Sequence, residues 1–461
     1  MADPNTAVQT FFSMMEDQGG VVVKDPPKFD LEAYISNYQG RTRFDRLLLI
    51  GKCSKVLCVD ALKAAVSEAL SGKDVQRYRE AWDCIRVAGP NEPEAVFDEA
   101  WVKGTVQSNA AETHRLEAEL RGYKNNLIKE SIRMGNEDLG RHLEATGDLS
   151  GAVEAYSRMR PDISTAKHII DVGKHLVDLA VQRREWGHVI ANAAKISGFP
   201  NPDDDKVVQP YLRTMQGIGL LGQGKYREAA YSFLMIEGAA TAQATQNDFV
   251  TPNDVAVYGG LLALATMNRK ELKIRVLEKS NFRAFLELEP HIRRAITQFV
   301  SGRYSACLEI LESYRADYLL DIHLQKHIPT LYSQIRSKCI VQYLVPFSCV
   351  TLETMNKAFA PPGQSIEQEL VAMIKSGALQ ARIDTIDKLV TTPKAQPKAA
   401  MQASALQTAN NFEKEALDRI RRMSILSADL EVKGPRKGHS AWERSSGATE
   451  SWYAPDQAEM D

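Results

Sequence analysis

Residues 365–384 read SIEQELVAMIKSGALQARID, and the spacing of their apolar side chains changes halfway. The first half repeats apolar residues at helical spacing and stops at a glycine, which is typical of an amphipathic helix. Leu379, Ala381 and Ile383 then alternate with polar residues, as in a strand with one buried face. A second short strand is predicted at 388–391. A helix that leads directly into a hairpin predicts the end of a winged-helix module.

Two partner helices are predicted directly upstream of this segment. The first covers 328–344 and the second 351–360, each with apolar residues on one face. Pro361 and Pro362 end the second helix, because proline lacks the backbone N–H that a helix needs. Three helices and a hairpin complete the predicted winged helix.

A winged helix is usually first suspected of binding DNA, but the charges of this one disfavour that function. Its last helix carries Glu367 and Glu369 against Lys375, and the acidic and basic residues of its hairpin balance one another. Affinity for duplex DNA requires several Lys or Arg side chains that neutralise phosphates. We therefore expect no nucleic-acid partner.

The edge of the predicted hairpin suits a protein partner better. An edge strand leaves backbone donors and acceptors unpaired, and another subunit can add its own strand there. The alternative is a wing that is simply solvated and protected by its charges. The subunit-interface residues predicted here are Leu379, Ala381, Arg382 and Ile383.

The middle of the chain contains helical repeats. Residues 139–161 match the tetratricopeptide pattern, in which a small residue such as Ala152 lets two helices approach and an aromatic residue such as Tyr156 fills the gap to the next pair. Weaker copies follow, each with an aromatic residue in the place of Leu149. The residues predicted to pack the repeats are Ala152, Tyr156, Trp186, Tyr226 and Tyr304. Unrelated amphipathic helices in a bundle are the alternative.

Composition is that of an ordinary globular protein. The chain has 461 residues, of which 44% are apolar and 25% charged, which allows roughly two to four domains. Its net charge of -2 gives no general attraction to nucleic acid or to anionic membranes. The six cysteines form no CxxC pair and indicate reduced thiols in an intracellular protein. No secretory signal is visible, and we expect no membrane partner because every apolar run is too short to cross a bilayer.

The two ends of the chain differ from its middle. A helix is predicted over 401–430, where apolar residues step by four and three along an otherwise charged surface. Such a helix is marginal alone in water, so its stripe needs a partner. The predicted contacts are Phe412, Ile420, Met423 and Leu430. The predicted divisions are a disordered N-terminus at 1–28, a repeat arm at 29–275, a winged-helix module at 276–391, a linker at 392–400, the helix at 401–430 and a disordered tail at 431–461.

No catalytic or metal-binding constellation is recognisable. A zinc metalloprotease of the kind found in helical regulatory complexes requires an H-x-H pair, which this chain lacks. His323 and His327 have the spacing of a helical zinc motif, but Leu324 stands where that motif has its glutamate. Glycine-rich phosphate loops and dinucleotide fingerprints are also missing. We expect a protein that is not an enzyme, with no catalytic residues, no metal and no cofactor.

A helical-repeat arm that leads into a winged helix ending EQELVAMIKSGALQARID resembles the PCI-domain family. This family is shared by the proteasome lid, the COP-nine signalosome and translation initiation factor three. Within it, IVQYLVPFSCVTLETMNKAF at 340–359 and FDLEAYISNYQGRTRFDRLLLIGKCSKVLCVDALKAAV at 29–66 resemble the subunit-one family of the signalosome, and we expect a fungal member. The resemblance covers roughly residues 29–391.

This resemblance implies a non-catalytic scaffold subunit of the complex that removes the ubiquitin-like modifier Nedd from cullins. The partners it implies are other PCI subunits, the helical bundle of the signalosome and, through the complex, cullin-RING ubiquitin ligases. It also implies a location in the cytoplasm and nucleus. The winged-helix module alone is shared with the paralogous lid subunit of the proteasome, which is the alternative function. A PCI protein that binds nucleic acid is a third possibility.

Overall fold

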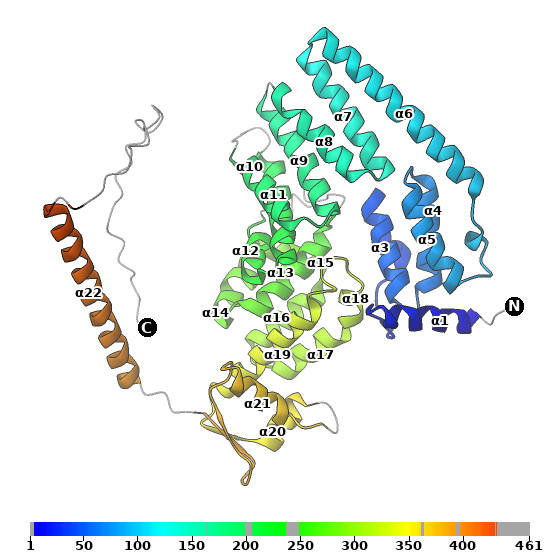
Figure 1. Cartoon of the computed structure of the whole chain (residues 1–461). Helices are drawn as coiled ribbons and strands as arrows, with labels where there is room; N and C mark the ends of the chain where they lie inside the picture. Colours follow the sequence, from blue (N-terminus) through cyan, green and yellow to red (C-terminus); the bar gives the residue numbers. More distant parts are fainter. Residues whose placement is uncertain are drawn as a thin grey trace. The chain divides into compact units, whose positions relative to one another are not determined.

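The structure is a computed structural model that describes residues 4–163, 165–198, 205–236, 249–360, 364–392, 397–428 and 430. Helices make up most of it, so the mainly α class predicted from the sequence is confirmed (Figure 1). The chain divides into two units, residues 1–392 and residues 393–461. The first unit contains the helical repeats and the winged helix, and the second contains the C-terminal helix.

The first unit begins with a helical block. Its elements are α1 (Pro4–Asp17), α2 (Leu31–Ile35), α3 (Gly40–Cys53), α4 (Cys58–Ser71), α5 (Val75–Ala88) and the 3-10 turn η1 (Pro93–Ala95). The prediction that residues 1–28 are disordered is wrong for α1. Phe11 and Phe12 are 2% and 1% exposed and belong to the core that α3, α4 and α5 build, so burial of their rings stabilises the helix. The glycines and prolines that suggested disorder lie after α1 or at its first residue.

The repeat arm follows as a series of helices that each pack against the next (Figure 1). These helices are α6 (Glu99–Asn126), α7 (Lys129–Thr146), α8 (Leu149–Arg158), α9 (Ala166–Gln182), α10 (Trp186–Ser197), α11 (Asp205–Gly222), α12 (Tyr226–Leu234) and α13 (Pro252–Thr266), with the 3-10 turn η2 (Arg160–Asp162) after α8. The helical repeats predicted from the sequence are therefore present.

The sequence pattern also marks where the second helix of a pair begins. Leu149, Trp186, Tyr226 and Tyr304 are the first residues of α8, α10, α12 and α17 (Tyr304–Ser313). Ala152 and Tyr156 on α8 are both fully buried. A Cβ added at Gly140 of α7 would lie 2.7 Å from the Tyr156 ring, so the glycine is what allows α7 and α8 to approach so closely.

Beyond α13 the chain continues through short helices without a break in the core. They are α14 (Arg269–Glu271), the π-helical turn η4 (Leu272–Leu277), α15 (Ser280–Leu288), α16 (Pro290–Val300), α17 and α18 (Arg315–Leu319). One cluster of buried apolar side chains extends from Ile170 on α9 to Val390 in the winged helix. The arm and the winged helix thus share a core, and the division at 275/276 stays a prediction.

The winged helix has the predicted helices and a small sheet. Its helices are α19 (Ile328–Leu344), α20 (Leu352–Phe359) and α21 (Glu367–Lys375), and its strands are β1 (Cys349–Thr351), β2 (Arg382–Asp384) and β3 (Leu389–Thr391). The strand order is β1-β3-β2, and both pairings are antiparallel. The sequence did not predict β1, whose three residues are too few to show an alternating pattern.

The first strand of the hairpin is shorter than predicted. It begins at Arg382, whereas the alternation of apolar residues suggested a start at Leu379. The backbone N–H of Leu379 donates to the carbonyl of Met373 at 3.2 Å and caps the end of α21. Gly377 adopts a φ of +76° at the same turn, which glycine tolerates best.

The second unit contains α22 (Pro397–Ser427), a helix close to the predicted range of 401–430. Its described side chains are almost all exposed within the chain. The predicted tail at 431–461 lies outside the described residues. Among the helices that the structure describes, none combines the length and the apolar content needed to span a membrane.

Candidate assembly interface

One arginine links the three helices of the winged helix. Arg336 on α19 forms two parallel bonds with the Glu369 carboxylate on α21, from Nε to Oε1 at 2.7 Å and from Nη2 to Oε2 at 3.0 Å. Its Nη2 also donates to the carbonyl oxygen of Phe359 at the end of α20, at 2.8 Å. A bidentate pair fixes direction as well as distance. Glu369, one of the acidic residues that disfavour DNA binding, therefore also orients α21.

The small sheet leaves β2 at one edge. Ile383 of β2 pairs with Val390 of the central strand β3, and Val390 is fully buried. Among the described residues, β3 is the one strand that pairs with β2, so the outer side of β2 carries backbone groups without a ladder partner. Asp384 accepts hydrogen bonds from the backbone N–H groups of Ile386 and Asp387 at 2.9 and 3.2 Å, which stabilises the hairpin turn.

The predicted interface residues of the wing occupy different environments. Arg382 is exposed, and Ala381 and Ile383 are half-buried. The side chain of Leu379 is only 5% exposed and belongs to the chain's own core, so a partner cannot reach it without rearrangement. Ile386, at the tip of the hairpin, is 90% exposed and was not singled out from the sequence.

The predicted contacts on α22 are solvent-exposed in the isolated chain. The exposed fractions of Phe412, Ile420, Met423 and Leu430 are 73%, 58%, 69% and 72%. Leu406 and Leu417 on the same helix are also exposed. Within the unit that α22 forms, no described residue covers these side chains. An exposed apolar stripe of this length on one helix is typical of a surface that packs against another protein.

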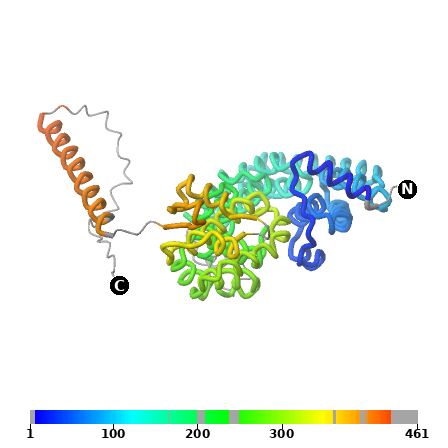
Figure 2. The backbone as a smooth tube through the Cα atoms, turned by 90° about the horizontal axis from the view of Figure 1, so that it is seen from below, coloured from blue at the N-terminus to red at the C-terminus, as the bar shows by residue number. Residues whose placement is uncertain are grey.

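A buried ionic network forms a second site, which sequence reasoning missed. Arg46 on α3 is fully buried, and its Nη1 and Nη2 atoms lie 2.8 and 3.1 Å from carboxylate oxygens of Asp321 and Asp254. Asp254 lies on α13, and Asp321 lies just after α18. The network thus joins the N-terminal block to two segments far away in the sequence. In Figure 2 the blue N-terminal trace runs beside the yellow-green segment around α18, as these bonds require.

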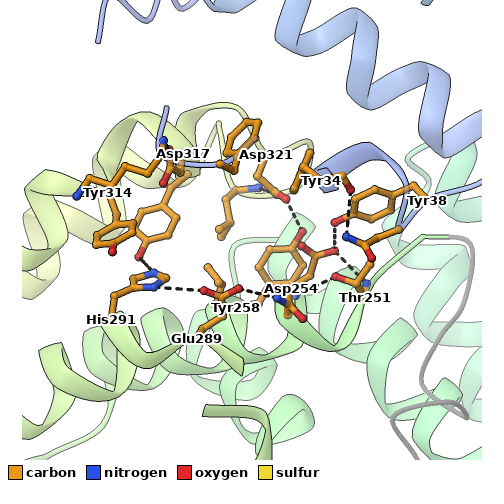
Figure 3. Close-up of a pocket in the computed structure, with 17 residues that line it drawn as sticks. Tyr34, Tyr38, Thr251, Asp254, Tyr258, Glu289, His291, Tyr314, Asp317 and Asp321 are labelled. Atoms are coloured by element: carbon orange, nitrogen blue, oxygen red, sulfur yellow. Dashed lines mark hydrogen bonds and ion pairs between the residues drawn. The ribbon is translucent and has the colours of Figure 1, made fainter. Parts of the chain in front are cut away.

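Tyrosine rings surround the buried guanidinium. Arg46 lies 4.0 Å from the ring centre of Tyr38 and donates a hydrogen bond to the hydroxyl of Tyr34. The hydroxyls of Tyr38 and Tyr258 donate to Asp254 and Asp321, each at 2.7 Å (Figure 3). Charged groups this deeply buried are stable only when they are paired and hydrogen-bonded. Both Nη atoms of Arg46 and both carboxylates meet this condition, whereas Nε of Arg46 has no hydrogen-bond partner among the described residues.

The pKa shifts in the network follow from burial and from the arginine charge. Burial raises the pKa values of Tyr38 and Tyr258 well above the ordinary tyrosine value, so both stay protonated and act as donors. Burial also raises the pKa of Asp254, against the opposing charge of Arg46. At Asp321 burial acts in the same direction, but Arg46 and the hydrogen bonds to the carboxylate outweigh it and lower the pKa.

A cavity of about 240 Å³ lies beside this network. Figure 3 shows Tyr34 and Tyr38 at one end of it and His291 and Tyr314 at the other. At the second end, the backbone N–H of Lys28 donates to Asp317 at 2.8 Å. The segment before α2 is therefore attached to α18, while Arg46 attaches α3 to the residues after α18. Both contacts fix the N-terminal block against the base of the winged helix.

The two histidines with helical zinc spacing each contact an aromatic side chain. His323 packs edge-on against the ring of Trp186, and His327 Nδ1 lies 3.1 Å from the hydroxyl of Tyr226. Within the described residues, no three His, Cys, Asp or Glu side chains are grouped so that they could hold a metal ion.

Two family models match the chain. The model described as 26S proteasome subunit RPN7 matches residues 98–275, and the PCI domain model matches residues 311–394. The first match covers the repeat arm, and the second covers the winged helix with its sheet.

Curated relatives align over almost the whole chain. The COP9 signalosome complex subunit 1 of Neurospora crassa is 54% identical over 93% of this chain and 94% of its own length. The protein of the same name from Emericella nidulans is 48% identical over 91% and 89%, and that from Arabidopsis thaliana is 36% identical over 88% and 92%. The chain therefore belongs to the COP9 signalosome complex subunit 1 family.

Proposed function

We propose that this protein is a non-catalytic scaffold subunit of the COP9 signalosome, which supports the removal of Nedd from cullins and thereby the regulation of cullin-RING ubiquitin ligases. It assembles with other PCI subunits through the edge strand β2 and with a bundle of helices from other subunits through α22. Family membership supports the complex, and the exposed surfaces described above support the mode of assembly.

The exposed stripe of α22 is the observation that carries this proposal. A single helix is marginal in water, and its stability normally comes from an apolar face packed against something else. Full burial of a side chain such as Phe412 or Ile420 stabilises a complex by about 1.5 to 3 kcal/mol. Since α22 forms a unit of its own with that face exposed, other subunits are the proposed source of the packing.

The wing contributes a second, directional contact. The outer backbone groups of β2 provide main-chain hydrogen bonds to an added strand. Arg382 and Asp384, both exposed on this strand, provide charges of both signs at its ends. The solvated wing remains the alternative, in which β2 is simply protected by those charges.

We infer that catalysis in the complex belongs to another subunit. The sequence supports this inference, because it lacks an H-x-H pair and has Leu324 where a helical zinc motif has its glutamate. The proposed partners include cullin-RING ligases through the complex but neither nucleic acid nor membrane, and the proposed location is the cytoplasm and nucleus. The balance of charges on α21 and the hairpin supports the absence of nucleic acid from the proposed partners.

The alternative is a place in the proteasome lid, favoured by the family model that matches residues 98–275. Affinity purification of the tagged full chain, followed by mass spectrometry, separates the two. Co-purification with signalosome subunits is expected, and recovery with proteasome particles in their place would overturn the proposal.

The contact at β2 is tested by placing proline at two neighbouring positions, Arg382→Pro and Ile383→Pro. Successive N–H groups of a strand point to opposite sides, so one variant removes a donor facing β3 and the other removes an outward donor. The variant that removes the donor facing β3 should lower the melting temperature of the isolated subunit. The variant that removes the outward donor should leave the melting temperature nearly unchanged and weaken co-elution with partner subunits on size-exclusion chromatography. If the proline that preserves the fold also preserves assembly, β2 is not a contact strand.

A further inference from the structure

Among the turns that lead into the second helix of a repeat pair, one departs from the others. The turns that precede α8, α12 and α17 each have a glycine with positive φ two residues before the helix, at Gly147, Gly224 and Gly302, with φ of 98°, 76° and 80°. The turn before α10 has Arg184 at that position, with φ of 58°. Its backbone bonds match those of the turn at Gly224, with the N–H of each donating three residues back, at 3.0 and 2.8 Å.

An arginine in this position is disfavoured by its backbone. The left-handed conformation brings Cβ of an L-residue close to the following carbonyl, which glycine avoids. Residues in such conformations persist where the surrounding structure compensates, and they occur frequently at binding sites. Leu127 and Lys388 adopt similar positive φ values, so the backbone only marks Arg184, and the surroundings of its side chain decide its role.

Arg184 lines a cavity of about 310 Å³ that is separate from the one in Figure 3. The walls come from α3, from the end of α9 and start of α10, from α11 and from the segment before α19. Trp186, Ile218 and Leu221 form an apolar wall, and Lys326, His323 and His327 are polar groups of the lining.

The charges of this cavity do not cancel. Arg184 and Lys326 form no ion pair and no side-chain hydrogen bond with any residue that the structure describes. Asp45 is the acidic residue of the lining, and Nη2 of Arg77 lies 2.8 and 3.0 Å from its two carboxylate oxygens. Arg184 interacts electrostatically with Asp45 without a direct ion pair, so the cations Arg77, Arg184 and Lys326 outnumber this one carboxylate around the hollow.

The histidines add neutral hydrogen-bonding groups. Burial lowers the pKa of His323 to about 4, so its ring is neutral at pH 7 and carries one N–H donor. The ring lies in the cavity lining between Trp186 and Tyr258, with centroid distances of 6.3 and 6.2 Å. One nitrogen of His327 is already engaged by the hydroxyl of Tyr226 at 3.1 Å.

We propose that this cavity binds a phosphate monoester, with Arg184 and Lys326 holding the phosphate and the wall around Trp186 receiving the organic group. Two unpaired cations match the charge of a phosphate dianion, and the arginine fork matches its oxygens. A carboxylate carries one charge and would leave one cation unpaired. The ester comes either from a small metabolite or from a phosphorylated side chain of a protein, and both present the same group.

Binding is tested with phenyl phosphate on the full chain, by following the ³¹P line width at constant ionic strength. Constant ionic strength is needed because salt screens contacts at an exposed rim. Benzoate is the monoanionic comparison in a competition arm. A phosphoserine peptide and its unphosphorylated form make the second arm, which distinguishes a protein-borne phosphate from a small ester.

The variants are Arg184→Gly, Lys326→Gln and, as a matched control, Arg183→Ala. Glycine suits the backbone at 184, so this variant should melt at or above the temperature of the parent protein, and misfolding cannot explain a loss of binding. Removing one charge-assisted contact should weaken binding of phenyl phosphate about tenfold or more in either of the first two variants. Arg183 lies outside the cavity and pairs with Glu185 at 2.9 Å, so its loss should change nothing.

Equal binding to the parent protein and to the Arg184→Gly variant would overturn the proposal. So would a failure of both phenyl phosphate and the phosphoserine peptide to bind, or a preference for benzoate. Binding of phenyl phosphate with no gain from the peptide assigns the site to small esters, and the reverse assigns it to a phosphorylated protein.

Discussion

Replacing Arg46 with methionine should strongly destabilise the N-terminal block. The variant removes the guanidinium and leaves two carboxylates, Asp254 and Asp321, with side chains only 10% and 8% exposed. Removing one partner of a buried ion pair typically costs about 3 to 5 kcal/mol, because the remaining charge stays out of water. Here two charges are left, so the upper part of that range is expected.

A neighbour on the same helix provides the matched control. Arg43 pairs with Glu68 at 3.3 Å, and its side chain is 42% exposed. Exposed ion pairs contribute about 0 to 1 kcal/mol, so Arg43→Met should change the free energy of unfolding by no more than that. Urea denaturation followed by circular dichroism measures both variants. The N-terminal block should also become sensitive to limited proteolysis in Arg46→Met alone.

The loss of stability in Arg46→Met should depend on pH, and the burial of Asp254 and Asp321 determines the direction of this dependence. Without Arg46, burial raises the folded-state pKa values of Asp254 and Asp321 above their unfolded values. A raised carboxyl pKa stabilises the folded state at low pH and loses that contribution as pH rises through it. The difference in free energy of unfolding between Arg46→Met and the parent protein should therefore decrease as the pH falls from 7 to 5. Adding Asp254→Asn and Asp321→Asn should restore part of the loss at pH 7.

A gap that stays constant with pH, or an Arg46→Met variant as stable as Arg43→Met, would refute this reasoning. The first result would mean that the two carboxylates reach water when the arginine is removed. The second would mean that the network contributes nothing to folding.

Three further outcomes are expected. Ala152→Leu should overpack the buried cluster that Ala152 and Tyr156 form with side chains of α9 and cost about 1 to 3 kcal/mol in thermal unfolding, and an unchanged melting temperature would contradict close packing there. Burial lowers the pKa of Lys338 to about 8, so the unfolded chain binds more protons above that pH; stability should rise from pH 8 to pH 10, and Lys338→Met should flatten that rise relative to the parent protein. Truncation after Val432 should leave assembly intact on size-exclusion chromatography, and loss of assembly would assign a contact to the tail.

Most of the fold could be predicted from local sequence patterns. The spacing of apolar residues changes from helical to alternating around Gly377, and aromatic residues begin α10 and α12. Both signals belong to short segments and can be recognised without tertiary structure. Elements whose stability comes from distant partners were missed or misplaced. Phe11 and Phe12 order α1 only through burial against α3 to α5, which no local signal reports.

The candidate sites divide in the same way. The stripe of α22 is a helical period and could be predicted, as could the charge balance of the wing. The pairing of Arg46 with Asp254 and Asp321 could not, because 208 and 275 residues separate the partners. The burial of Leu379 was also hidden, since an apolar residue in an alternating run looks the same in a strand and in a helix cap.

The most direct test of the scaffold proposal is the assembly of a variant with two aspartates on the stripe of α22, Phe412→Asp and Ile420→Asp. The control variant, Gln407→Asp and Asn411→Asp, adds the same charge on the opposite face of the helix. Both subunits are mixed with the remaining signalosome subunits, and co-elution and complex mass are measured.

The stripe variant should lose about 3 kcal/mol or more of packing, which weakens association about a hundredfold or more, while its own melting curve stays that of the parent protein. The control should assemble normally. Normal assembly of the stripe variant, with the same complex mass as the parent protein, would contradict the proposal that α22 docks this subunit into the complex.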